Sequence, residues 1–158
     1  MREVILLRHA HASTAAAAQG DHDRALSPIG QQEAVAAGRW LAEHGLHPDR
    51  VLCSPSLRTR QTLAGVQDAL GDLDVRFEPA IYEATPGTLA ALLDAQNDAE
   101  RLLLVGHNPG LEQLLALLNS GQSGDHRGMP PGAIAVLHVS PEAAIEPGAA
   151  SLHAFWWP

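Results

Sequence analysis

Short apolar runs that alternate with helical stretches constrain the fold of this chain more than any other feature. Four runs read as strands, namely EVILL at residues 3–7, RVLCS at 50–54, VRF at 75–77 and RLLLVG at 101–106. Continuous apolar runs of this length are typical of strands that are buried on both faces of a sheet. We therefore expect all four to be central strands.

A helix is predicted after each of these strands. The first begins at Ser27-Pro28, where Ser27 suits the N-cap and Pro28 the first turn, and Gly45 suits its end. The other helices are predicted from SLRTRQTLAGVQDALG, TPGTLAALLDAQ and NPGLEQLLALLNSG, and two late strands from AIAVLHV and SLHAFWW. This alternation predicts an α/β fold, a three-layer sandwich in which helices flank a mostly parallel central sheet.

Length, charge and cysteine content narrow the class of protein. The 158 residues fit one domain spanning 1–158, and no linker divides them. The net charge of −8 argues against a nucleic-acid partner, which needs a basic face. A single cysteine, Cys53, fits a reducing compartment, and the N-terminal apolar run is too short for a signal peptide or a membrane span. We expect a soluble cytoplasmic protein without a membrane partner.

Three of the predicted strand ends carry residues that suit phosphate chemistry. Arg8 and His9 end the first strand, Arg58 lies in the first turn of the helix after the second, and His107 follows the strand at 101–106. The carboxyl ends of parallel strands share one edge of a sheet, where α/β proteins bind their ligands. Helix N-termini at that edge favour anions, and the arginine fork matches phosphate oxygens. These residues therefore predict a site for a compact dianion such as phosphate.

Four blocks of the sequence, LLRHA, DRALSPIG, SPSLRTRQT and VGHNPGLEQL in this order, resemble the histidine phosphatase superfamily. The resemblance implies the phosphoglycerate mutase-like fold and covers almost the whole chain. Ala10, where many members have glycine, the short length and the late MPPGAIAVL block resemble the SixA-type phosphohistidine phosphatases. An alanine run replaces the polar residue that mutase-like members carry in the first loop, which weakens a phosphoglycerate assignment.

The resemblance implies a role for each residue of this site. His9 would be the nucleophile that becomes phosphorylated, while Arg8, Arg58 and His107 would bind the phosphoryl oxygens. A neutral imidazole is a competent nucleophile near pH 7, and positive charge stabilises the transferring group. The scheme needs no metal and no other cofactor.

Two further residues have alternative interpretations. Glu83 is the best candidate for the acid that protonates the leaving oxygen, or it is a loop carboxylate that caps the helix near Thr85. Arg24 begins a block that matches an Arg-x-Leu-x-x-x-Gly block of the family. It would bind phosphate, tie a loop over the site, or pair with Asp23. Of these, a structural role is favoured.

The substrate stays open between two classes. A phosphohistidine on a signalling protein needs little acid catalysis, because imidazole leaves more readily than an alkoxide. A small phosphorylated metabolite would need Glu83 as the acid. A third alternative, from another functional class, is a non-catalytic phosphate- or phosphoprotein-binding module, which the presence of His9 disfavours.

Other features of the sequence have weaker functional interpretations. His9 and His11 could form a metal pair, but barrels with such pairs need about 250 residues, so His11 is expected to be exposed. Cys53 and Arg58 have the wrong spacing for a cysteine phosphatase, and a buried Cys53 is favoured. Residues 155–157, Phe-Trp-Trp, are expected to pack on the core, and the loop at 119–132 either borders the site or is a solvated connection.

Overall fold

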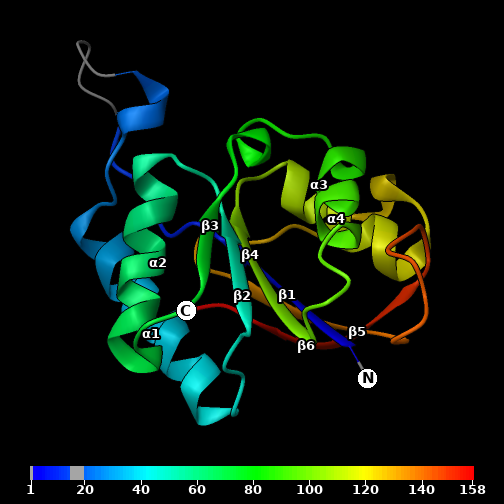
Figure 1. The fold of residues 1–158 in the computed structure, drawn as a ribbon. Helices are drawn as coiled ribbons and strands as arrows, with labels where there is room; N and C mark the ends of the chain where they lie inside the picture. The colour runs from blue at the N-terminus through cyan, green and yellow to red at the C-terminus, as the bar shows by residue number, and fades with distance from the viewer. Residues whose placement is uncertain (1, 15–19) are drawn as a thin grey trace.

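The computed structural model describes residues 2–14 and 20–158. Its centre is a six-stranded sheet with the strand order β3-β2-β4-β1-β5-β6 (Figure 1). The strands are β1 (Arg2–Arg8), β2 (Arg50–Cys53), β3 (Val75–Phe77), β4 (Arg101–Gly106), β5 (Ile134–Val139) and β6 (Ala150–Trp156). The pairs β3-β2, β2-β4 and β4-β1 are parallel, while β1-β5 and β5-β6 are antiparallel. The prediction of a mostly parallel sheet is confirmed.

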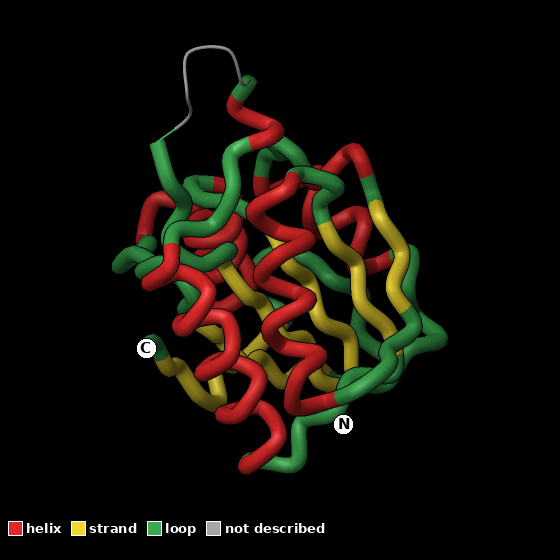
Figure 2. Tube along the Cα trace, turned by 90° about the vertical axis from the view of Figure 1, so that its left-hand side faces the viewer, coloured by secondary structure: helices red, strands yellow, loops and turns green. Residues whose placement is uncertain are grey.

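Helices cover both faces of this sheet and complete the three layers (Figures 1 and 2). The helices are α1 (Pro28–Glu43), α2 (Leu57–Leu70), α3 (Pro86–Asp94) and α4 (Gly110–Ser120), with short 3₁₀ helices η1 (Asp21–Asp23), η2 (Pro79–Ile81) and η3 (Ser123–Asp125). In β1, Ile5 and Leu7 pack in the core that α1 and α2 cover, and Val4 and Leu6 pack in the core under α3 and α4. All four side chains are fully buried, as expected for a central strand.

Side-chain caps explain where three of the helices begin. Ser27, Ser56 and Thr85 each accept a hydrogen bond from the backbone N–H three residues later, at the start of α1, α2 and α3. Such a cap satisfies one of the free N–H groups at a helix N-terminus. The first helix ends at Glu43, and Gly45 follows it with a φ of 66°.

The structure corrects two expectations about strands and aromatic residues. The strand at 75–77 is an edge strand, because it pairs only with β2, and its Arg76 and Phe77 side chains are exposed. Phe155 and Trp156 pack against the cores, as expected, and Trp156 stacks on Trp40 with ring centroids 5.8 Å apart. Trp157 is 56% exposed, so the core-packing prediction is wrong for this residue.

The strand register brings the ends of β1, β2 and β4 to one edge of the sheet. Arg8 lies opposite Gly106, and Cys53 lies opposite Val105. The backbone N–H of His9 continues the ladder and donates to the Gly106 carbonyl at 3.0 Å. Within the described residues, no helix has the length and apolar character needed to cross a membrane.

Candidate active site

His9 follows β1 directly and is only 8% exposed. Its Nδ1 lies 2.7 Å from the Ala10 carbonyl oxygen. Because a carbonyl oxygen only accepts, Nδ1 carries the proton and Nε2 keeps its lone pair. Burial, together with the positive charges of Arg58, Arg8 and Arg24, lowers the pKa of His9 to about 4. The imidazole is therefore neutral at pH 7, with its basic nitrogen available to an electrophile.

Arg8 and Arg58 are both held through their terminal nitrogens. Arg8 Nη1 donates to the Met129 carbonyl at 2.9 Å. Arg58 lies in the first turn of α2, and its Nη1 and Nη2 donate to the Asp21 carbonyl at 2.7 Å and to Asp21 Oδ2 at 3.0 Å. The Nε atoms of both arginines are buried without a hydrogen-bond partner among the described residues. Both guanidinium charges lie close enough to His9 to lower its pKa, so the site is suited to an anion that would accept from these donors.

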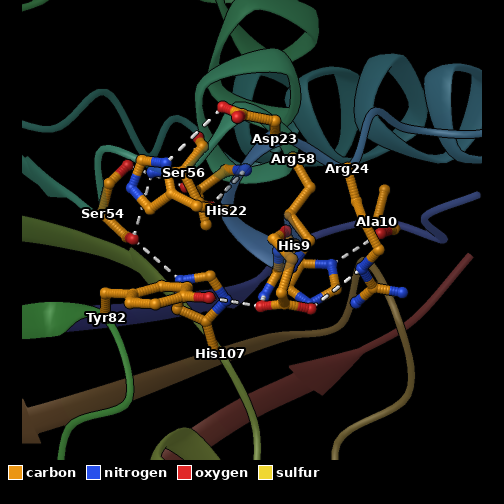
Figure 3. A network of polar contacts seen from close by, with 12 residues as sticks. His9, Ala10, His22, Asp23, Arg24, Ser54, Ser56, Arg58, Tyr82 and His107 are labelled. Atoms are coloured by element: carbon orange, nitrogen blue, oxygen red, sulfur yellow. Dashed lines mark hydrogen bonds and ion pairs between the residues drawn. The ribbon is translucent and has the colours of Figure 1, made fainter. Parts of the chain in front are cut away.

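His107 follows β4 and lies beside His9, with ring centroids 5.4 Å apart. Its Nε2 lies 2.8 Å from the Ser54 hydroxyl oxygen, at the end of β2 (Figure 3). Burial and the nearby positive charge of Arg58 lower the pKa of His107 to about 3. Its Nδ1 is buried and, within the part of the chain that the structure describes, has no hydrogen-bond partner. A hydroxyl that donates to Nε2 would leave a proton on Nδ1 for a bound oxyanion.

Asp21 links the residues at the mouth of the site. Arg24 Nε lies 3.0 Å from Asp21 Oδ1, so its carboxylate partner is Asp21; the alternative of a pair with Asp23 is wrong. Tyr82 donates its hydroxyl to Asp21 Oδ2, and the ring of Tyr82 packs edge-on against His107 at 5.4 Å (Figure 3). The hydrogen bonds from Tyr82 and Arg58 lower the pKa of Asp21 to about 2.

Glu83 comes directly after Tyr82 in the chain. It is exposed and has a φ of 56°, a left-handed conformation that is uncommon outside glycine. Thr85, and not Glu83, caps α3, because the Thr85 hydroxyl accepts from the Thr88 N–H. The interpretation of Glu83 as a helix cap is therefore wrong.

The remaining candidates have structural roles. The ring of His11 is tied to α1, since its Nδ1 lies 2.7 Å from the Ser27 hydroxyl oxygen. Cys53 is fully buried, and burial raises the pKa of its thiol to about 12, which leaves it protonated at pH 7. The loop at 119–132 does border the site, because the Met129 carbonyl accepts from both Arg8 and Asn108.

Sequence reasoning missed three residues that contact the candidate site: Ser54, Asp21 and Tyr82. Ser54 follows a strand within the block that contains Arg58, so its position alone could have suggested it. Asp21 lies in an acidic turn, and Tyr82 is an isolated aromatic residue in a loop. Nothing in the sequence around these two predicts that they meet.

Comparisons with known proteins agree with this geometry. A family model described as histidine phosphatase superfamily (branch 1) matches residues 4–101. An uncharacterized protein of Mycobacterium tuberculosis is 38% identical over 149 residues, covering 87% of this chain and 91% of that protein. The phosphohistidine phosphatase SixA of Escherichia coli is 33% identical over 127 residues, and the match covers 77% of this chain and 76% of that protein.

The same fold is found in a crystal structure of a protein from Agrobacterium tumefaciens. That protein is assigned as a phosphohistidine phosphatase SixA. It superposes with a TM-score of 0.88 at 32% identity and covers 99% of this chain and 98% of that one. The matched family model, the sequence relatives and this superposition agree on one classification. This chain is a phosphatase of the histidine phosphatase superfamily, with the phosphoglycerate mutase-like fold.

Proposed function

We propose that this chain hydrolyses phosphohistidine on a cytoplasmic signalling protein, through a phosphorylated His9. The observation that carries the proposal is the neutral, buried His9, whose Nδ1–H is bound to the Ala10 carbonyl and whose Nε2 is left as the nucleophile. The name of the E. coli relative supports phosphohistidine as the substrate class. The free thiol of the buried Cys53 fits the proposed cytoplasmic location.

In the first step, His9 Nε2 attacks phosphorus and a new N–P bond forms. The bond from phosphorus to the substrate imidazole breaks, and the departing nitrogen takes the electron pair and a proton from solvent water. Arg8 Nε, Arg58 Nε and His107 Nδ1 are the buried donors proposed to bind the phosphoryl oxygens. Fixed donors of this kind stabilise charge as it develops, which is the main requirement of phosphoryl transfer.

In the second step, water attacks phosphorus, the bond to His9 breaks, and inorganic phosphate leaves. A phosphorylated His9 carries a proton on Nδ1 and hence a positive charge. The Ala10 carbonyl, 2.7 Å from Nδ1, would stabilise that cation and keep the ring in place. Hydrolysis restores the neutral imidazole.

A small phosphoester is the second candidate substrate, and Glu83 is the observation that favours it. A non-glycine residue with positive φ stores backbone strain, which is common in active sites. Glu83 follows Tyr82, whose ring contacts His107, so it lies in the segment next to the proposed clamp. An alkoxide leaving group needs an acid, and Glu83 is the proposed donor.

Substrate choice tests this proposal. We expect the protein to hydrolyse a phosphohistidine-bearing protein with a higher kcat/KM than any member of a panel of sugar and nucleotide phosphates. Glu83→Gln should reduce hydrolysis of alkyl phosphoesters and leave phosphohistidine hydrolysis nearly unchanged, because imidazole needs less acid catalysis. Preference for a small phosphoester, with equal damage to both reactions in the variant, would contradict the proposal.

We also propose that residues 1–158 act as one domain, since all six strands belong to one sheet and the A. tumefaciens structure covers 99% of the chain. A non-catalytic binding module has little support, because the chain belongs to a phosphatase family and retains His9. Arg24 would assist phosphate binding through Asp21, to which it is paired.

A further inference from the structure

The two arginines of the proposed clamp share one bonding pattern, in which Nη atoms donate to protein oxygens and Nε is buried without a partner among the described residues. A guanidinium has an end-on edge between its two Nη atoms and a side-on edge between Nε and one Nη, and either edge can bind a phosphate in two places. Arg58 uses both Nη atoms on Asp21, while its Nε is buried without a partner among residues 2–14 and 20–158. Asp21 therefore leaves the Nε donor of Arg58 unused.

Asp21 binds side chains from three separate segments of the chain, by hydrogen bonds to Arg58 and Tyr82 and by an ion pair with Arg24. Arg58 comes from α2, Tyr82 from the segment between β3 and α3, and Arg24 from the end of η1. In Figure 3, Tyr82 lies beside His107, and Arg58 and Arg24 lie near His9. Arg58 also donates to the Asp21 backbone carbonyl, so one residue binds both Nη atoms of its guanidinium.

Tyr82 contacts Asp21, Arg58 and His107. Its hydroxyl donates to Asp21, while the Arg58 guanidinium carbon lies 5.8 Å from the centre of its ring. The same ring packs on His107 on one side and on His22 of η1 at 5.0 Å on the other. Loss of the Tyr82 side chain would therefore remove a hydrogen bond to Asp21 and the ring contact with Arg58.

We propose that Asp21 and Tyr82 are positioning residues, which hold Arg58 with its side-on edge toward the transferring phosphoryl group. The inference rests on the phosphoryl-binding role of Arg58 in the proposed function. A fixed guanidinium loses less side-chain entropy when it binds the phosphoryl group than a free one does. Asp21 acts through Arg58 and is not a proton donor, because it is ionised at neutral pH.

A competing role for Asp21 makes the opposite prediction. Its carboxylate could occupy the anion position on Arg58 and thus compete with the substrate. The end-on contact favours positioning, since Asp21 uses only the two Nη atoms and leaves the Nε donor unused. Removal of the Asp21 carboxylate would weaken oxyanion binding if it positions Arg58, and would strengthen binding if it competes.

The test uses Asp21→Ala, Asp21→Asn and Tyr82→Phe, with Asp98→Ala as the matched control. Asp98 also forms a two-contact pair with an arginine, at 2.7 and 2.9 Å from Arg50, and its side chain is 67% exposed against 53% for Asp21. Asp98 precedes β4, at the opposite end of the strand from His107. Binding of tungstate, a tetrahedral oxyanion, is measured by calorimetry. The kcat and KM values are measured with the phosphohistidine-bearing protein as substrate.

We expect Asp21→Ala to weaken tungstate binding and to lower kcat/KM by about tenfold to a hundredfold, the range found for residues that orient metal ligands. Asp21→Asn keeps an oxygen acceptor and should retain more of both properties. Tyr82→Phe should lower both in the same direction, and Asp98→Ala should change neither. Unfolding curves of all four variants show whether each remains folded.

Tighter tungstate binding in Asp21→Ala would show competition and overturn the proposal. Unchanged tungstate affinity in folded Asp21→Ala and Tyr82→Phe would reduce both residues to structural roles and would also overturn it. Because tungstate binding needs no turnover, it separates this inference from the proposed function. A wild type that binds tungstate but hydrolyses no phosphohistidine would contradict the substrate assignment alone.

Discussion

Burial determines the protonation state of the two histidines in the site. The pKa of His9 is lowered to about 4 and that of His107 to about 3, while a free histidine side chain titrates near 6.5. In a ligand-free sample, NMR titration of the two rings should give midpoints well below 6.5. A midpoint between 6 and 7 for His9 would show that the ring is not held neutral by its surroundings and would remove the explanation for its nucleophilicity.

The same shifts make stability depend on pH. Both histidines have a lower pKa in the folded protein than in the unfolded chain, so the unfolded chain binds more protons between about pH 4 and 6.5. The free energy of unfolding should therefore decrease as the pH is lowered through this window. Urea unfolding of the wild type and of His107→Asn at several pH values checks this, and the variant should lose less stability than the wild type on acidification. An equal or larger loss in the variant would contradict the assignment.

At the residue scale, the sequence predicts the parts of the site that follow strands. Arg8, His9 and His107 stand directly after strands or at their ends, so the strand pattern alone places them at one edge. Asp21 and Tyr82 could not be predicted, because both lie in irregular segments and meet through tertiary contacts. The identity of the residue paired with Arg24 depends on the local path of η1, which likewise has no sequence signature.

At the scale of elements, the contact between α1 and α2 depends on a glycine. A Cβ added at Gly38 would lie 2.7 Å from the Val66 backbone carbonyl oxygen, so the helices would have to move apart. Because α2 carries Arg58 in its first turn, this contact also supports the site. The sequence shows both helices but not their close approach, which is set by small residues on each.

We expect Gly38→Ala to destabilise the protein by about 1–3 kcal/mol, the usual cost of overpacking a core. The matched control is Gly87→Ala in α3, where no atom outside the neighbouring residues lies within 4 Å of the added Cβ. Alanine there should leave stability unchanged or raise it by up to about 1 kcal/mol. Urea unfolding measures both. Equal stability of the two variants would show that the α1–α2 contact tolerates a larger separation.

The sequence predicts which segments are helices and which are strands, but it does not predict as well whether a strand lies at the edge or the centre of the sheet. The caps at Ser27 and the pattern of the later strands led to the correct helix and strand positions. The edge position of β3 was not predictable, because a three-residue run is too short to show whether one or both of its sides are paired. The exposure of Trp157 was not predictable either, because the aromatic run does not show that β6 ends at Trp156.

At the scale of the whole molecule, the sheet order creates the site. β1 and β4 are neighbours, yet β1 leads to α1 on one face of the sheet and β4 leads to α4 on the other (Figure 1). The connections that leave these strands diverge, and ligands of α/β proteins bind in the crevice formed there. His9 and His107 begin those two connections. The sequence predicts the elements, but the order of the strands depends on pairing between distant segments.

The most direct measurement of the central claim is the detection of phosphate on His9 during turnover. The wild type and His9→Ala are incubated with a radiolabelled phosphohistidine protein, stopped in alkali, and analysed by peptide mapping. We predict an alkali-stable, acid-labile label on the peptide that contains His9, with no label and no turnover in the variant. Turnover without a labelled wild-type protein, or substantial activity in folded His9→Ala, would contradict the account.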